Sequence, residues 1–110
     1  MNHTEIIDIH SHFTAPEYLN MLEKHHASLE DGFPVPLWNL QEHLSLMEQC
    51  NIRWTLLSLS TPQPYFHGVE QESVEMSRQL NEQMAQIKKE HPQKIGFQAT
   101  LPLPDIDASI

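Results

Sequence analysis

The sequence is poor in several residue types, and each shortage narrows the class of protein. A single cysteine, Cys50, excludes an internal disulfide and is typical of a reducing compartment. Only 6 Lys and Arg residues stand against 15 Asp and Glu, and the net charge of -9 argues against nucleic-acid binding. The longest apolar runs are far shorter than the roughly 20 residues that span a bilayer, and no basic and apolar leader follows Met1. We therefore expect a cytoplasmic chain with no membrane or nucleic-acid partner.

The remaining composition fits a folded domain. The chain has 39% hydrophobic and 19% charged residues, with 3 Gly and 8 Pro, which excludes collagen-like and low-complexity sequence. Its 110 residues allow one compact core at most, so residues 1–110 are expected to form a single unit. The most informative feature is the content of 8 histidines, because imidazole binds metals and transfers protons near neutral pH.

The most suggestive segment lies between Glu5 and Phe13. Its isoleucines are interrupted by polar residues, which predicts a short strand buried on both faces. The alternation of a strand places Asp8, His10 and His12 on one side, whereas a helix would set the two histidines about 200° apart. A His-x-His pair is weak evidence for a metal site by itself. Its position at the carboxyl end of an apolar strand strengthens the hypothesis, because barrel active sites lie at that end.

Apolar periodicity and turn residues divide the rest of the chain into helices and strands. The expected elements after the first strand are a helix at 14–30, an irregular loop at 31–36, a helix at 39–50, a strand at 53–60 with loop residues 61–64, a helix at 68–90, a strand at 95–101 and the start of a helix at 105. Thr14, Asn39 and Asp105 are the expected helix caps, and Asn51 suits the left-handed turn that ends a helix. This alternation indicates an α/β fold built from parallel βαβ units with right-handed crossovers.

Few of the other candidate residues have a pattern as suggestive as the histidine pair. Asp8 is a candidate to orient a metal-bound imidazole. His67 follows the second strand, so it is either a substrate-loop residue or a helix-capping or surface histidine. Trp38 and Phe33 suit either a pocket wall or packing beneath a loop. Cys50 is expected to be a small buried residue on a helix.

Three blocks of the sequence resemble one family. They are IDIHSHFTAPEYL near the start, the run from Met47 to Ile52 that leads into LLSLSTPQP, and IGFQATLPLPD near the end. Together they are similar to the amidohydrolase-related family that includes aminocarboxymuconate-semialdehyde decarboxylase and resorcylate-type decarboxylases. The blocks occur in the family's order and span nearly the whole chain. The chain has Asn51 where relatives often have Gly, a difference that leaves the turn feasible.

The resemblance implies a specific fold and chemistry. Family members are (β/α)₈ barrels that hold one divalent ion, commonly Zn²⁺, and the first-strand ligands map onto His10 and His12. About three of eight strands are present, so the chain is expected to be the amino-terminal portion of the barrel, cut at the start of the helix after the third strand. The resemblance implies a further histidine and an aspartate as ligands and a catalytic histidine, all beyond Ile110. No catalytic residue is therefore assigned within these residues.

Three functions remain open at this stage. The resemblance first implies non-oxidative decarboxylation of a small unsaturated or aromatic carboxylic acid, with that acid as the small-molecule partner. The second is metal-dependent hydrolysis of a lactone or amide. The third is an inactive truncated chain that acts as a binding or assembly module, because an open three-stranded sheet leaves two edges that a second copy could cover.

Overall fold

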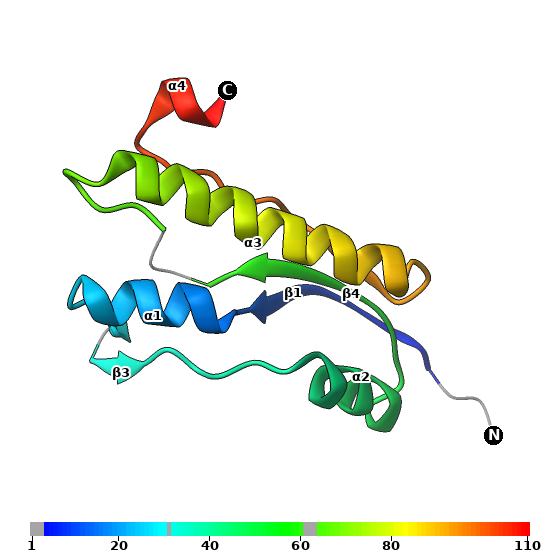
Figure 1. Cartoon of the computed structure of the whole chain (residues 1–110). Coiled ribbons are helices and arrows are strands. Elements are labelled where there is room, and N and C mark those ends of the chain that lie inside the picture. The colour runs from blue at the N-terminus through cyan, green and yellow to red at the C-terminus, as the bar shows by residue number, and fades with distance from the viewer. Residues whose placement is uncertain (1–3, 31, 61–63) are drawn as a thin grey trace.

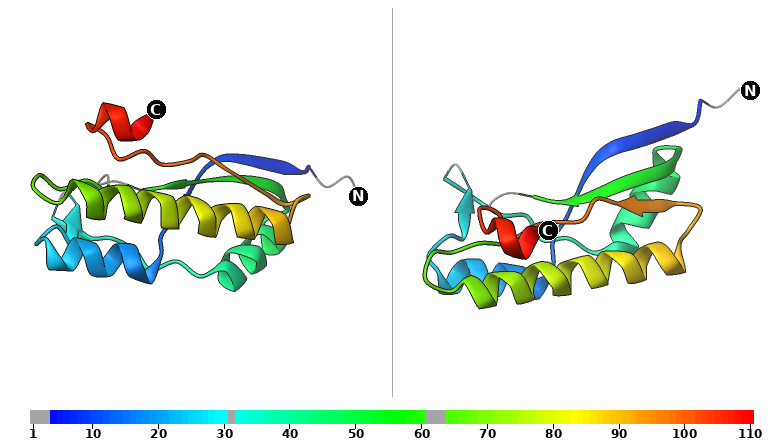
Figure 2. Two further views of the ribbon diagram at one scale, coloured as in Figure 1. Left: turned by 45° about the horizontal axis from the view of Figure 1, so that its top comes forward. Right: turned by 90° about the horizontal axis from the view of Figure 1, so that it is seen from above.

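The computed structural model describes residues 4–30, 32–60 and 64–110, which form a flat α/β layer structure of 57 × 31 × 19 Å. Its centre is a three-stranded sheet in the order β1 (Ile6–Phe13), β4 (Ile52–Leu59) and β5 (Ile95–Phe97), and both strand pairs are parallel. Helices α1 and α3 lie along one face of this sheet (Figures 1 and 2). The predicted parallel βαβ architecture is therefore confirmed.

Helix α1 (Pro16–Lys24) is shorter than predicted, and its expected cap is used elsewhere. Ala15 takes the capping position without a side-chain hydrogen bond, while the Thr14 hydroxyl donates to the Pro36 carbonyl oxygen. The helix ends at Lys24 because His26 adopts a left-handed conformation with a φ of 57°. The prediction of one helix as far as residue 30 is wrong for this reason.

The segment predicted as an irregular loop contains a small hairpin. Strands β2 (Leu29–Glu30) and β3 (Phe33–Pro34) pair antiparallel, and Gly32 in the turn has a φ of 84°. Proline is compatible with such a short edge pairing because the edge strand has one side that needs no donor. Residue 31, like the predicted loop residues 61–63, lies outside the described residues.

Helix α2 (Leu40–Gln49) confirms two capping predictions and contradicts one burial prediction. The Asn39 side chain accepts a hydrogen bond from the Glu42 N–H at 3.0 Å, and Asn51 has the left-handed φ of 57° expected at the helix end. Cys50 is exposed, not buried as predicted. The helix presents its apolar stripe to β4, and Cys50 lies outside that stripe.

Helix α3 (Glu70–Glu90) supplies much of the core. Leu80 and Met84 have no exposed surface, and they pack with Leu57 of β4 and Ile95 of β5. The prediction that the methionine stripe of this helix is core is confirmed. Glutamates in the first turn and lysines in the last complement the helix dipole. Within the residues that the structure covers, no helix combines the length and apolarity needed to cross a membrane.

The last part of the chain is less regular than predicted. Strand β5 ends at Phe97, so the predicted strand to residue 101 is too long. The backbone of Thr100 instead pairs with the Asn81 side chain of α3, which accepts at 2.7 Å and donates at 2.9 Å. Helix α4 (Ile106–Ser109) follows the predicted cap, because Asp105 accepts a hydrogen bond from the Ala108 N–H.

The two faces of the sheet differ in cover. Phe13 and Leu57 are 2% and 0% exposed beneath the helices, whereas Ile7 and Ile9 of β1 are 52% and 73% exposed. The prediction that the first strand is buried on both faces is therefore wrong for the described structure. We call the helix-packed side the covered face and the other side the open face. The open face carries the candidate site.

Candidate metal centre

The His10 and His12 side chains converge near the carboxyl end of β1. Their Nε2 atoms lie 3.0 Å apart, and the ring centroids are 5.0 Å apart with the planes at 62°. Two imidazole nitrogens at about 2.0–2.1 Å from one ion, at an angle of about 90–110°, would lie about 2.8–3.4 Å apart. Both residues are exposed, so an ion has access from solvent. The donor set and its spacing therefore fit two ligands of one divalent ion.

A β-bulge shapes the strand just before this pair. Asp8 is aligned with Thr55 and Ser11 with Leu57, so three steps along β1 match two steps along β4. The extra residue interrupts the simple alternation of side chains. Asp8 is half-buried and aligned with the buried Thr55 of the covered face, while His12 is exposed. The expectation that Asp8 shares the face of the histidines is wrong for this reason.

Asp8 nevertheless acts on the backbone of the site. Its Oδ1 accepts a hydrogen bond from the His10 N–H at 3.0 Å. In the bulge this N–H is available to a side chain, and the hydrogen bond fixes the backbone that carries the imidazole. The structure thus connects Asp8 to the main chain of His10. The expectation that Asp8 orients an imidazole directly stays a prediction.

His43 is a candidate that the sequence reasoning passed over. It is half-buried on α2, its Nδ1 lies 3.4 Å from the Trp38 Nε1 donor, and its Nε2 is buried with no partner among the described residues. Burial lowers the pKa of His43, and the negative charge of Asp8 opposes that shift. A signal was present in the sequence, since residue 43 falls on the stripe that includes Leu40, Leu44 and Met47.

His67 lies apart from these contacts. Its side chain is 96% exposed, and its Nδ1 is 3.7 Å from a carboxylate oxygen of Glu70 near the start of α3. Backbone hydrogen bonds to the Glu70 carboxylate, first from its own N–H and then from the Gly68 N–H, lower the pKa of its carboxyl group. The structure places His67 on the surface of the loop before α3. Its role as a substrate-loop residue stays a prediction.

Two hollows adjoin the carboxyl ends of β1 and β4. One has a volume of about 60 Å³ and is lined by His12, Thr14, Pro36, Leu37, Trp38 and Ser60. The other has a volume of about 190 Å³ and lies beside Ser58, Gln98 and Thr100. Only the first includes a residue of the histidine pair. We call it the His12 hollow.

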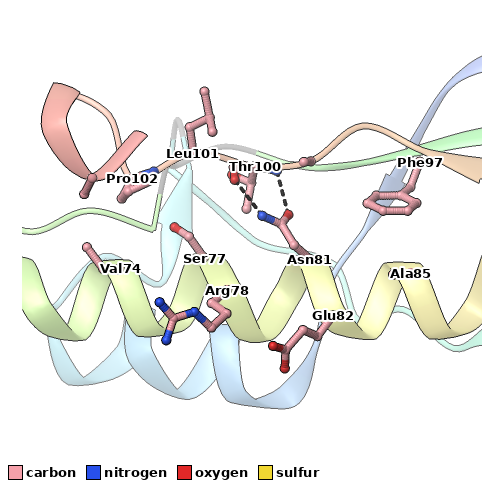
Figure 3. Close-up of a pocket in the computed structure, with 12 residues that line it drawn as sticks. Val74, Ser77, Arg78, Asn81, Glu82, Ala85, Phe97, Thr100, Leu101 and Pro102 are labelled. Carbon is pink, nitrogen blue, oxygen red and sulfur yellow. Dashed lines mark hydrogen bonds between the residues drawn. The ribbon is translucent and has the colours of Figure 1, made fainter. Parts of the chain in front are cut away.

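A larger hollow of about 450 Å³ lies away from the histidine pair, between α3 and the segment that follows β5 (Figure 3). Its walls include Val74, Ala85 and Phe97, and the Asn81 hydrogen bonds to Thr100 cross its base. None of the described residues that line it is a histidine. In the ranges 4–30, 32–60 and 64–110, no three His, Cys, Asp or Glu side chains converge to hold a metal. The histidine pair is therefore at most part of a metal site.

Sequence comparison finds relatives among fungal decarboxylases, although no family model matches the chain. The chain is 33% identical over 97 residues to the decarboxylase macB of Penicillium terrestre, across 87% of this chain and 28% of that protein. It is 29% identical over 96 residues to the 6-methylsalicylic acid decarboxylase of Penicillium expansum, across 87% of this chain and 29% of that protein. The chain thus spans less than a third of these curated relatives.

Solved structures agree with this relationship. An amidohydrolase II crystal structure matches 96% of the chain with a TM-score of 0.88 at 28% identity, and the match covers 34% of that protein. A dihydroxybenzoic acid decarboxylase from a Polaromonas species, solved with bound manganese and the inhibitor 2-nitroresorcinol, shares the fold with a TM-score of 0.73 at 20% identity. The match covers 97% of the chain and 33% of that structure. The chain is therefore similar to proteins named as decarboxylases, and it has the fold of about a third of an amidohydrolase II protein.

Proposed function

We propose that this chain provides the first metal-binding strand of a metal-dependent decarboxylase that acts on a small aromatic or unsaturated carboxylic acid. The observation that carries the proposal is the 3.0 Å separation of the His10 and His12 Nε2 atoms at the carboxyl end of a parallel strand. The relatives named as decarboxylases favour this reaction over the hydrolysis of a lactone or amide. A cytoplasmic setting remains a prediction from the single cysteine.

The residues have distinct roles in this proposal. His10 and His12 bind one divalent ion through neutral imidazole nitrogens, with Zn²⁺ as first choice because it accepts such ligands readily. When bound, the ion would supply positive charge that polarises a substrate oxygen or lowers the pKa of bound water. Asp8 holds the His10 backbone through its 3.0 Å hydrogen bond. Further ligands and the proton-transfer group are proposed to come from residues outside these 110.

Metal binding tests the ligand assignment. Isothermal titration with Zn²⁺ and with Mn²⁺ should show binding that His10→Ala and His12→Ala each weaken by about tenfold or more, since loss of a ligand exceeds the usual cost of losing an outer contact. His67→Ala is the matched control, because this histidine is 96% exposed and lies in the loop before α3, not on β1. Unchanged affinity in the His10→Ala, His12→Ala double variant would exclude the site.

Product analysis tests the reaction. The protein that carries this strand should release CO₂ from 2,6-dihydroxybenzoate in a metal-dependent reaction and should leave aryl lactones and anilides intact. Hydrolysis of the lactone without CO₂ release would instead support the hydrolase. Chelation with EDTA followed by addition of Zn²⁺ or Mn²⁺ identifies the metal that restores the activity.

The exposed edge and open face of β1 support a second candidate role in assembly. Ile6, Ile7 and Ile9 are 46%, 52% and 73% exposed, which is unusual for three isoleucines in one strand. Further strands of the same protein or a second copy would bury them. Sedimentation of the 110-residue chain tests this role. A stable dimer that Ile9→Lys dissociates would support it, and a monomer would exclude it.

A further inference from the structure

Residues 35–38 are held at the end of β1 by contacts of Pro36 and Trp38. The Thr14 hydroxyl donates to the Pro36 carbonyl oxygen at 3.1 Å. The Trp38 ring packs edge-to-face on Phe13, with centroids 5.1 Å apart, and its Nε1 donates to His43 Nδ1 at 3.4 Å. Thr14 and Phe13 directly follow His12 in the sequence. These contacts therefore fix the segment relative to the proposed metal ligand.

Between the two attachments Leu37 stands free of the core. Its side chain is 87% exposed, and it borders two hollows together with Trp38. The His12 hollow has a volume of about 60 Å³, and a second one of about 240 Å³ lies on the α1 side, against Leu19 and Asn20. Leu37 and Trp38, together with Thr14, therefore line both hollows and lie between them.

The size and chemistry of the His12 hollow select a small uncharged group. A single water needs about 10–15 Å³ measured this way, so about 60 Å³ suits a group of one or two carbons and excludes a ring. Its described lining residues include no carboxylate, lysine or arginine. An ionised carboxylate would lose its hydration there without a partner of opposite charge. The lining therefore favours an uncharged group over the substrate carboxylate.

We propose that Leu37 and Trp38 determine substrate specificity by walling a pocket, the His12 hollow, for a small alkyl substituent on the ring of the bound acid. This inference rests on the proposed function, because it places the acid at an ion held by His10 and His12. The pocket accepts a methyl group beside the metal-binding end of the acid. The Leu37 side chain excludes larger branches by closing the way to the hollow against α1.

Trp38 provides a direct readout of this pocket. The chain has 2 tryptophans, so its ¹⁵N spectrum contains two indole N–H signals, which Trp38→Phe assigns, and Trp54 serves as the internal reference. In the Zn²⁺-loaded chain, titration with 2-methylbenzoate should shift the Trp38 signal and leave the Trp54 signal unchanged. Benzoate lacks the methyl group and should shift the Trp38 signal much less.

Size selectivity tests the wall itself. We expect the Zn²⁺-loaded chain to bind 2-methylbenzoate about five- to tenfold tighter than 2-isopropylbenzoate, near the lower end of the range for a hydrophobic pocket because this one is partly open. Leu37→Ala joins the two hollows and should remove or reverse this preference. Leu46→Ala is the matched control, since Leu46 is an exposed leucine of α2 at a different hollow. Its selectivity should equal that of the wild-type chain.

The outcomes separate this inference from the proposed function. If Zn²⁺ does not perturb the His10 and His12 ring signals, the proposed function fails, and this inference fails with it. If Zn²⁺ binds but benzoate and 2-methylbenzoate shift the Trp38 signal equally, or if Leu37→Ala retains the wild-type selectivity, only this inference is overturned. Zn²⁺ binding together with a methyl-dependent Trp38 shift supports both.

Discussion

The covered and open faces of the β1–β4–β5 sheet both carry branched apolar side chains, but they differ in how far these side chains are buried. On the covered face, Leu57 and Ile95 are fully buried beneath Leu80 and Met84 of α3. On the other side, isoleucines of β1 remain exposed beside the converging histidines. Burial of apolar surface therefore stabilises one face, while the other presents ligands and hollows. The two imidazole rings thus lie together even though the isoleucines beside them are exposed.

The bulge in β1 changes which residues of the strand lie on the covered face and which lie on the open face. Before it, Asp8 is aligned with Thr55 on the covered face, and after it Ser11 is aligned with Leu57 on that same face. Without the extra residue, one of these alignments would place a core position on the open side. The bulge thus lets β1 contribute Phe13 to the core and His12 to the open face. The same bulge therefore serves both the packing of the core and the placement of a proposed metal ligand.

A matched pair of substitutions tests the difference in burial between the two faces most strongly. Leu57→Ala removes a fully buried side chain from the core and should lower the free energy of unfolding by about 2–5 kcal/mol. Ile9→Ala, at a side chain that is 73% exposed, should change it by less than about 0.5 kcal/mol. Urea unfolding followed by circular dichroism measures both. Equal losses in the two variants would show that the open face is packed in solution.

A second prediction concerns the part of the open face beside β5. Gly96 is aligned with Leu56, and a Cβ at this position would overlap the Trp54 indole ring. Gly96→Ala must displace this ring and should cost about 1–3 kcal/mol of unfolding free energy. Adding Trp54→Leu should recover part of the loss, because the smaller side chain makes room. An unchanged unfolding midpoint in Gly96→Ala would mean that the indole does not lie against the strand.

The sequence predicts the elements whose signals are local. The caps at Asn39 and Asp105, the left-handed Asn51 and the apolar stripe of α3 all depend on residues within a few positions of one another. The fold class followed from the order of these elements. The convergence of His10 and His12 was expected from their spacing alone, and the structure brings the two rings together.

Two of the failures involve partners that are distant in the sequence. Thr14 has the residue type of a helix cap, but its hydroxyl bonds Pro36, 22 positions away. The face of Asp8 depends on the register between β1 and β4, which the pattern of one strand does not contain. Tertiary contacts, which local patterns do not encode, decided each of these cases.

The smallest expected effect on the free energy of unfolding comes from His43, a half-buried titratable residue of α2. Burial lowers the pKa of His43 from its ordinary value near 6.5, although the charge of Asp8 opposes the shift. The unfolded chain then binds a proton more readily than the folded chain, so the free energy of unfolding should fall as the pH drops from about 7.5 to 5.5. His43→Asn keeps an acceptor for the Trp38 indole and removes the titration, so its stability should depend less on pH. Urea midpoints measured at both pH values compare the two chains. An identical pH dependence would mean that His43 is as hydrated in the folded chain as in the unfolded one, and the covered face would then end short of α2.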